Sequence, residues 1–165
     1  MARHHLAELN IAEALYPMDD ARMEGFTSRI NMINAMADRA DGFVWRLVDD
    51  NPETDGALDF RPFPNPNMLV NMSVWRDVQS LYSFVYKTVH AKLIGDRKDW
   101  FSLLKAHSTV MWWIEGGVTP TIEEAKARLE RLTEHGPSPD AFTFANTFTA
   151  DRKPLIWRAP KKDCA

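Results

Sequence analysis

The segment Asn71–Asp77, with the sequence Asn-Met-Ser-Val-Trp-Arg-Asp, decides the fold, and it continues into a stretch that ends near His90. Polar and apolar residues alternate from Asn71 to Val74, and the apolar Trp75 follows, which predicts a strand that ends in a tryptophan. Asp77 can accept hydrogen bonds from the free N–H groups of a following helix, and apolar residues then recur at helical spacing. The segment therefore predicts a strand, a turn and an amphipathic helix, with a ligand pocket between strand and helix.

Similar patterns predict the remaining elements. Strands are expected at His5–Ile11, Phe43–Val48, Met68–Trp75 and Val110–Ile114, and helices between Asp19 and Asp41, after Asp77 and after Thr121. The order is strand, helix, strand, strand, helix, strand and an added helix. This is the order of a ferredoxin-like α+β fold, in which an antiparallel sheet carries helices on one face.

Tryptophans occur on several of the expected strands, at Trp45, Trp75, Trp112 and Trp113. Because neighbouring strand positions point to opposite faces, both faces of the sheet are expected to be apolar. The face without helices then needs a cover, and a second copy of the chain is the simplest one. We therefore expect a homodimer that forms a dimeric α+β barrel.

The size and composition of the chain limit its class. A chain of 165 residues suits one domain, expected over residues 1–148, with a polar tail over residues 149–165. The single cysteine, Cys164, cannot pair within the chain, which favours a reducing, cytoplasmic setting. No apolar run resembles a signal peptide or is long enough to span a membrane. The net charge of −3 argues against a general nucleic-acid binder.

Candidate ligand-binding residues follow from the central strand. Asn71, Ser73 and Trp75 share one face of it, and asparagine is unfavourable in a strand unless its amide has a partner or a ligand. Asn10 on the first strand raises the same requirement. Two asparagines on neighbouring strands predict a polar patch in an apolar pocket, which is the usual composition of a small-molecule site.

Tyr86 and His90 are the candidate catalytic residues, both on the helix after the central strand. His90 flanks the apolar stripe, where a histidine is more often structural than catalytic, but an ordinary histidine pKa of about 6.5 keeps proton transfer open. Tyr86 can donate to a substrate carbonyl or simply pack with its hydroxyl in water. No metal site is expected, because His107 has no carboxylate or cysteine at metal-ligand spacing. The role of the proline-rich connection Asp49–Asn67 stays open.

Several of these segments resemble a bacterial family of domains of unknown function that belongs to the dimeric α+β barrel superfamily. They are Leu9-Asn10, Gly42–Leu47, Asn71–His90, Gly136-Pro137 and Ala141–Phe144, and the match runs from about His5 to Phe144. The resemblance implies a dimer with a pocket between sheet and helices in each subunit. Superfamily members include antibiotic-biosynthesis monooxygenases, which oxidise aromatic polyketides without a metal or flavin. Others are haem-degrading monooxygenases, chlorite dismutases and dye-decolorising peroxidases, which place a histidine under a haem.

The haem-degrading relatives use an asparagine on the first strand and a tryptophan and a histidine on the second helix. Asn10 matches the asparagine in kind and place. Phe84 occupies the position of the helical tryptophan, and the histidine position falls near Ile94, one turn after His90. Haem degradation is therefore implied by analogy, on one match of three.

The sequence thus predicts a monooxygenase-like enzyme that acts on a small hydrophobic or aromatic molecule without a bound cofactor. His90 and Tyr86 would move protons, and the substrate would contact Asn10, Asn71, Ser73, Trp75, Trp45 and Phe84. A haem-binding or haem-degrading protein, with His90 below the iron, is the first alternative. A non-catalytic ligand-binding or interaction module is the second.

Overall fold

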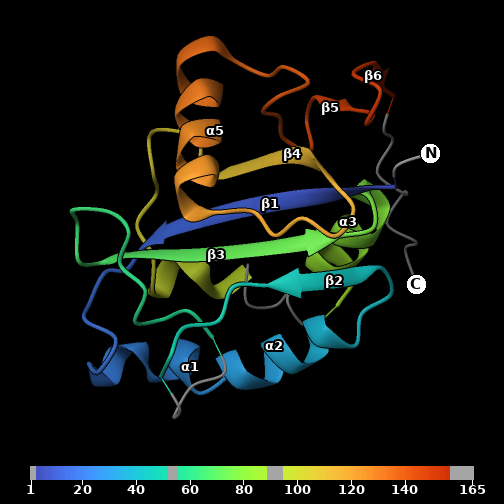
Figure 1. Ribbon diagram of the computed structural model, residues 1–165. Coiled ribbons are helices and arrows are strands. Elements are labelled where there is room, and N and C mark those ends of the chain that lie inside the picture. Colours follow the sequence, from blue (N-terminus) through green and yellow to red (C-terminus); the bar gives the residue numbers. More distant parts are fainter. Residues whose placement is uncertain (1–2, 52–55, 89–94, 157–165) are drawn as a thin grey trace.

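The computed structural model describes residues 3–51, 56–88 and 95–156 (Figure 1). A four-stranded antiparallel sheet lies at its centre, in the order β2-β3-β1-β4. The strands are β1 (His4–Glu13), β2 (Phe43–Arg46), β3 (Met68–Trp75) and β4 (Thr109–Glu115). The expected α+β class is confirmed, and each expected strand overlaps an observed one.

The helical elements are η1 (Ala21–Met23), α1 (Glu24–Thr27), α2 (Ile30–Asp38), α3 (Val78–Lys87), η2 (Arg97–Asp99) and α5 (Ile122–His135). Two of the α-helices, α3 and α5, begin at the expected caps. The Asp77 carboxylate accepts the backbone N–H of Ser80 at 2.8 Å, and the Thr121 hydroxyl accepts that of Glu124 at 3.2 Å. The single helix expected between Asp19 and Asp41 is instead divided into η1, α1 and α2.

Helix α5 covers one face of the sheet (Figure 1). Leu129 and Leu132 of this helix share a buried core with Leu9 of β1, Met72 of β3 and Trp112 of β4. The expectation of helices on one face only is therefore wrong, because the added helix lays its apolar stripe on the second face. The face that was expected to bind a second copy is closed within the chain.

Helices α2 and α3 lie against the other face. There Leu6 of β1 and Trp75 of β3 pack with Ala37 of α2 and with Leu81 and Phe84 of α3. These contacts lie at the end of the sheet where β1 begins, since Leu6 is paired with Trp75. The middle of the same face carries polar side chains instead.

The connection Asp49–Asn67 contributes to both sides of the sheet. Phe63 contacts the core beneath α5, and the Lys126 ammonium lies 5.1 Å from the centre of its ring. Gly56–Leu58 help to line the cavity on the opposite side. The described part of this connection is therefore a packed element of the fold.

The described fold includes residues up to 156. Strands β5 (Thr147–Phe148) and β6 (Pro154–Leu155) form a hairpin. Arg152 lies in the turn between these two strands and donates two hydrogen bonds to the Asp140 carboxylate, at 2.7 and 3.0 Å. The folded domain therefore extends past the expected boundary at residue 148, into the first part of the expected polar tail.

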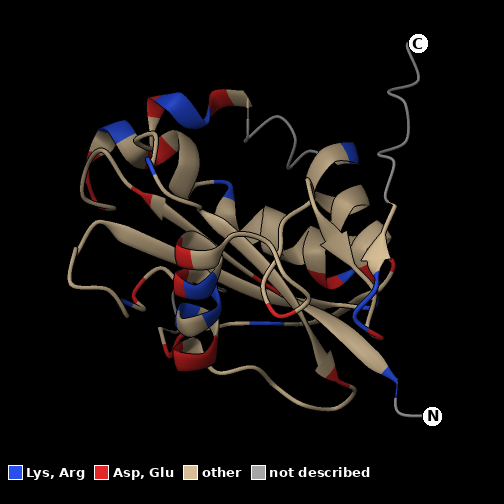
Figure 2. Ribbon diagram, turned by 90° about the horizontal axis from the view of Figure 1, so that it is seen from above, with Lys and Arg blue, Asp and Glu red and all other residues tan. Residues whose placement is uncertain are grey.

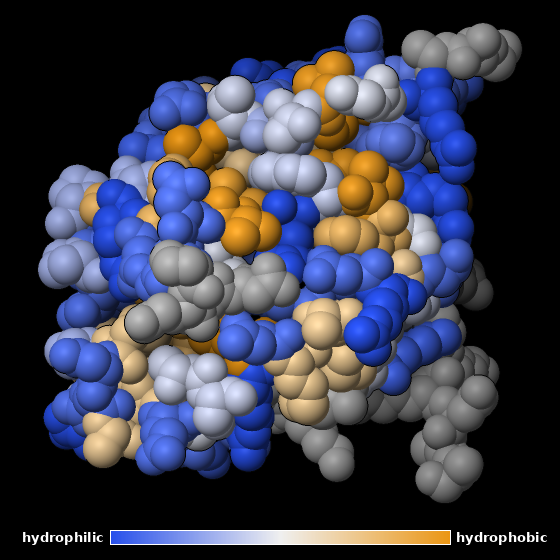
Figure 3. Space-filling model, turned by 60° about the horizontal axis from the view of Figure 1, so that its bottom comes forward, coloured by the Kyte–Doolittle hydropathy of each residue, from blue (hydrophilic) through white to orange (hydrophobic). Residues whose placement is uncertain are grey.

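The surface mixes charges of both signs with small apolar areas. Figure 2 shows Lys and Arg beside Asp and Glu along α5. On the face shown in Figure 3, hydrophilic residues break the apolar surface into separate patches. Within the described ranges, no helix is long and apolar enough to cross a membrane.

Candidate functional site

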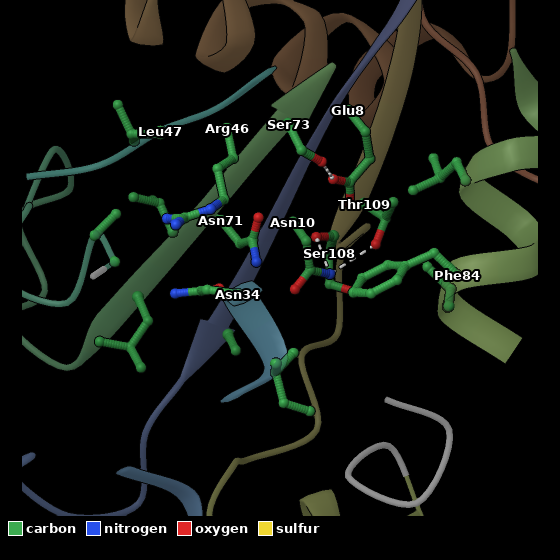
Figure 4. Close-up of a pocket in the computed structure, with 18 of the residues that line it drawn as sticks. Glu8, Asn10, Asn34, Arg46, Leu47, Asn71, Ser73, Phe84, Ser108 and Thr109 are labelled. Atoms are coloured by element: carbon green, nitrogen blue, oxygen red, sulfur yellow. Dashed lines mark hydrogen bonds between the residues drawn. The ribbon is translucent and has the colours of Figure 1, made fainter. Parts of the chain in front are cut away.

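A cavity of about 540 Å³ lies between the sheet and the helices α2 and α3 (Figure 4). Polar side chains of the sheet form its floor, namely Glu8, Asn10, Asn71, Ser73 and Thr109. Aromatic and aliphatic side chains form its walls, among them Phe26, Ile30, Ile33, Leu81, Phe84, Tyr86, Phe101 and Phe144. A polar floor, apolar walls and this volume are typical of small-molecule sites.

The register of the sheet brings the polar side chains together. Glu8 of β1 lies opposite Ser73 of β3. Asn10 of β1 lies opposite Asn71 of β3 on one side and Thr109 of β4 on the other. Directly paired residues point to the same face of a sheet, with their Cβ atoms about 5 Å apart. Residues far apart in the sequence therefore form one polar surface.

Glu8 is the acidic group of this surface, and only 8% of it is exposed. The Ser73 hydroxyl donates to Glu8 Oε2 at 3.1 Å, and the Trp75 indole N–H donates to Ser73 Oγ at 2.9 Å. No other described residue forms a hydrogen bond with the Glu8 carboxyl. The second carboxyl oxygen, Oε1, is therefore left for a ligand in the cavity.

Burial raises the pKa of the Glu8 carboxyl from 4.5 to about 8, because a buried carboxylate loses its hydration. The hydrogen bond from Ser73 favours the charged form, so it lowers the pKa and is the smaller effect. The carboxyl is thus mainly protonated at neutral pH. A group with such a pKa can both accept and return a proton near neutral pH.

Asn10 and Asn71 lie side by side, but they are held differently. Asn10 Nδ2 donates to the Thr109 hydroxyl at 2.8 Å and to the Ser108 carbonyl at 3.2 Å, which fixes the side chain. Asn71 is exposed in the middle of an inner strand, because the cavity opens over it. Its amide forms no hydrogen bond with the described residues, so it can offer a donor and an acceptor to a ligand.

Trp75 belongs to an aromatic stack at the cavity wall. Its ring centroid lies 5.2 Å from that of Phe84, nearly parallel, and 5.5 Å from that of Phe43, edge-on. Only 1% of Trp75 is exposed. Trp75 holds the Ser73 hydroxyl, and Phe84 forms part of the apolar wall.

Tyr86 lies at the edge of the cavity and is 47% exposed. Its ring centroid lies 4.6 Å from that of Tyr82 and 5.8 Å from that of Phe144. The Tyr86 hydroxyl forms no hydrogen bond with the described residues, so it is free to meet a ligand. His90, the other expected catalytic residue, lies outside the described residues.

Trp45 does not line the cavity. A β-bulge between Phe43 and Trp45 shifts the pairing of β2 by one residue, so that Trp45 lies opposite Val74 and Arg46 lies opposite Ser73. A shift of one residue moves a side chain to the other face of the sheet. Trp45, which was expected to bind a substrate, therefore packs in the core beneath α5 and is not among the residues that line this cavity.

Three charged residues of the cavity escaped the sequence-based prediction, namely Glu8, Arg46 and Arg97. Glu8 shares a strand face with Asn10, two residues away, and this alternation is the signal that could have identified it. Arg46 was hidden by the bulge, which no local pattern predicts. Arg97 lies in a polar stretch that is typical of a solvated surface.

The haem alternative placed its axial ligand at His90, which is not among the described walls of the cavity. They contain no histidine, cysteine or methionine, which are common axial ligands of haem iron. In the described part of the chain there is no group of three or more His, Cys, Asp or Glu that could hold a metal ion.

Comparisons with known proteins define the family. A structure of NE2512, a protein of unknown function from Nitrosomonas europaea, is similar, with 12% sequence identity and a TM-score of 0.44. The similarity covers 73% of this chain and 97% of that chain. No curated protein matches. A family model described as "Domain of unknown function (DUF3291)" matches residues 5–158, which is nearly the whole chain, and the chain therefore belongs to the DUF3291 family.

Proposed function

We propose that this protein is an enzyme that binds a small apolar or aromatic molecule in the cavity and exchanges a proton with it through Glu8. One observation carries the proposal. The buried Glu8 carboxyl faces the cavity with no cation partner among the described residues, and burial raises its pKa to about 8. Burying such a group costs stability, and perturbed carboxyls in cavities are frequent at catalytic sites.

The proton step uses the floor of the cavity. Glu8, as a carboxylate, accepts a proton from an acidic C–H or O–H group of the bound molecule. The electron pair of the broken bond stays on the molecule, which becomes an enolate or a phenolate. Asn71 Nδ2 can donate a hydrogen bond to the new oxyanion, because its amide faces the cavity two residues from Ser73, the partner of Glu8. Ser73, held by Trp75, keeps the carboxyl in place.

An oxygenase that needs no bound cofactor is the narrower form of this proposal. The anion formed at a CH₂ group would react with dioxygen. One oxygen atom would become a carbonyl of the product, and the other would leave as water. The four electrons that this requires come from the CH₂ group itself. The resemblance to antibiotic-biosynthesis monooxygenases and the ferredoxin-like strand order β4-β1-β3-β2 support this form. Tyr86, and His90 as predicted from the sequence, would assist with protons.

A screen followed by hydrogen–deuterium exchange tests the proton step. Aromatic ketones and phenols are screened by thermal shift, and proton NMR in D₂O then follows the acidic C–H groups of the ketones that bind. The wild-type protein should accelerate their exchange. Glu8→Gln should still bind the same ketones but exchange them at least about a hundredfold more slowly. Asn71→Leu should bind them more weakly, and Trp45→Phe, which alters a residue outside the cavity, should behave as the wild type.

The outcomes separate the alternatives. Exchange that persists in Glu8→Gln would contradict the role of Glu8. Binding without exchange by the wild type would leave a non-catalytic ligand-binding module. Oxygen uptake, measured with an electrode after addition of an exchanging ketone, tests the oxygenase form, and its absence would contradict that form alone.

A further inference from the structure

The positive and negative charges of the described side chains that line the cavity do not cancel. Its described lining residues include the acidic Glu8 and the basic Arg46 and Arg97. Arg46 is neutralised by Asp38, to which its Nε and Nη2 donate at 2.7 and 3.1 Å. Glu8 carries little charge at neutral pH, because burial raises its pKa to about 8. The positive charge of Arg97 is therefore left without compensation in the described cavity.

Arg97 lies at the end of the cavity beyond β1. Its carbonyl accepts the backbone N–H of Phe101 at 2.8 Å, and Phe101 bridges to Ala14, which follows the end of that strand. Arg97 and Phe101 both line the cavity. The Arg97 guanidinium forms no ion pair or hydrogen bond with the described residues, so none of them occupies its five N–H donors.

The distance between Glu8 and this end sets the shape of a ligand that reaches both. The cavity floor follows β1 from Glu8 to Ala12. Four residues of extended strand span about 13 Å. Between the two ends the walls are apolar, with Phe26 and Ile30 among them. A molecule that offers a proton to Glu8 and also reaches Arg97 is therefore elongated, with an apolar middle.

We propose that the ligand is an elongated aromatic or apolar acid whose carboxylate, or a similar oxyanion, binds Arg97 at the end of the cavity opposite Glu8. The inference rests on the proposed function, because it assigns a substrate class to the same cavity. A guanidinium binds a carboxylate through two parallel hydrogen bonds, which are stronger than hydrogen bonds between neutral groups. Arg97 is partly buried, so water screens this pairing less than it would on an open surface.

A matched pair of rigid probes tests the anion site. The probes are 4′-hydroxybiphenyl-4-carboxylate and 4′-hydroxybiphenyl-4-carboxamide, which have the same length and the same phenol end and differ in charge. Calorimetric titration at low salt should show the acid binding about tenfold more tightly than the amide. The difference should shrink as salt is added.

Substitutions at and beside Arg97 test whether this residue causes the preference for the acid over the amide. Arg97→Gln should bring the acid and the amide to similar affinities, and Arg97→Lys should keep part of the preference. Lys98→Gln is the matched control, because it removes the same charge from the next, exposed residue, which does not line the cavity. It should keep the full preference. Glu8→Gln should keep it too, since the two ends are separate.

The contradicting results are distinct from those of the proton step. Equal affinity of acid and amide for the wild type, a preference that survives Arg97→Gln, or no binding of the acid would each overturn the anion site. The screen with neutral ketones and phenols decides the proton step independently, so that step can stand if the anion site fails.

Discussion

Glu8 acquires its chemistry from its neighbours rather than from its position in the sequence. The alternation of β1 turns Glu8 to the cavity face, and the indole N–H of Trp75, on the same face of the sheet, donates to the Ser73 hydroxyl. The Ser73 hydroxyl then holds one oxygen of a carboxyl that has lost most of its water. These surroundings raise the pKa of the Glu8 carboxyl to about 8.

Replacing Glu8 with glutamine should remove a pH dependence of stability. The folded-state pKa of about 8 lies above the ordinary value of 4.5, so the folded state holds the proton more tightly than the unfolded state. The contribution of this proton to the free energy of unfolding is complete below pH 4.5. It is lost as the pH rises towards 8, by roughly 1.4 kcal/mol per pH unit. Urea unfolding between pH 5 and pH 9 measures it.

The comparison needs an exposed glutamate as its control. Wild-type stability should fall relative to Glu8→Gln as the pH rises. Glu115→Gln, at an exposed position of β4, should follow the wild type. Parallel curves of unfolding free energy against pH for the wild type and Glu8→Gln would show that the pKa of the Glu8 carboxyl is ordinary. That result would contradict the proposed role of Glu8 in proton exchange.

At the scale of elements, the strands and helix starts were predictable because local patterns determine them. The strand Met68–Trp75 was predicted at its observed bounds, and Asp77 and Thr121 cap the helices that follow them. The bulge in β2 was not predictable, because it arises from pairing with β3 and leaves no mark on the local alternation. That bulge decides that Arg46, and not Trp45, faces the cavity.

The sheet face that α5 covers could not be predicted from the sequence either. Its apolar stripe was evident, with Leu129 and Leu132 on one side of the helix. A stripe requires a partner surface, but the sheet offered two apolar faces and the stripe suits either. Only the fold assigns α5 to the face that had been expected to bind a second copy.

Truncation of the α5 stripe should destabilise the protein strongly. Leu132 is fully buried, so Leu132→Ala removes its packing and leaves a cavity, at a cost of about 2–5 kcal/mol. Leu103→Ala, at a leucine that is 91% exposed, is the control and should change stability by less than about 0.5 kcal/mol. Chemical unfolding measures both. Equal effects of the two substitutions would mean that α5 does not cover the sheet.

The whole molecule has three layers, with α5 on one side of the sheet and α2 and α3 on the other (Figure 1). The expected dimer depended on an apolar sheet face left open, and α5 closes that face. Large exposed apolar side chains do occur, such as Met32 on α2 and Val118 after β4, but they lie on different elements. The fold therefore gives no reason for an obligate dimer through the sheet.

The unfolding temperature should accordingly be independent of protein concentration. An obligate dimer becomes more stable as its concentration rises, whereas a self-contained domain does not. Thermal unfolding over a hundredfold range of concentration, with light scattering at each end, measures this. A midpoint that rises steadily with concentration would favour the dimer that was expected from the sequence.

The central claim is that a buried carboxyl at Glu8 exchanges protons near neutral pH, and a carbon-13 NMR titration of the glutamate carboxyls in the folded protein tests it most directly. Glu8→Gln assigns the signal. Ser73→Ala should move its midpoint upward, because the Ser73 hydrogen bond lowers the pKa. We predict a Glu8 midpoint near pH 8, and a midpoint near the ordinary value of 4.5 would contradict the claim.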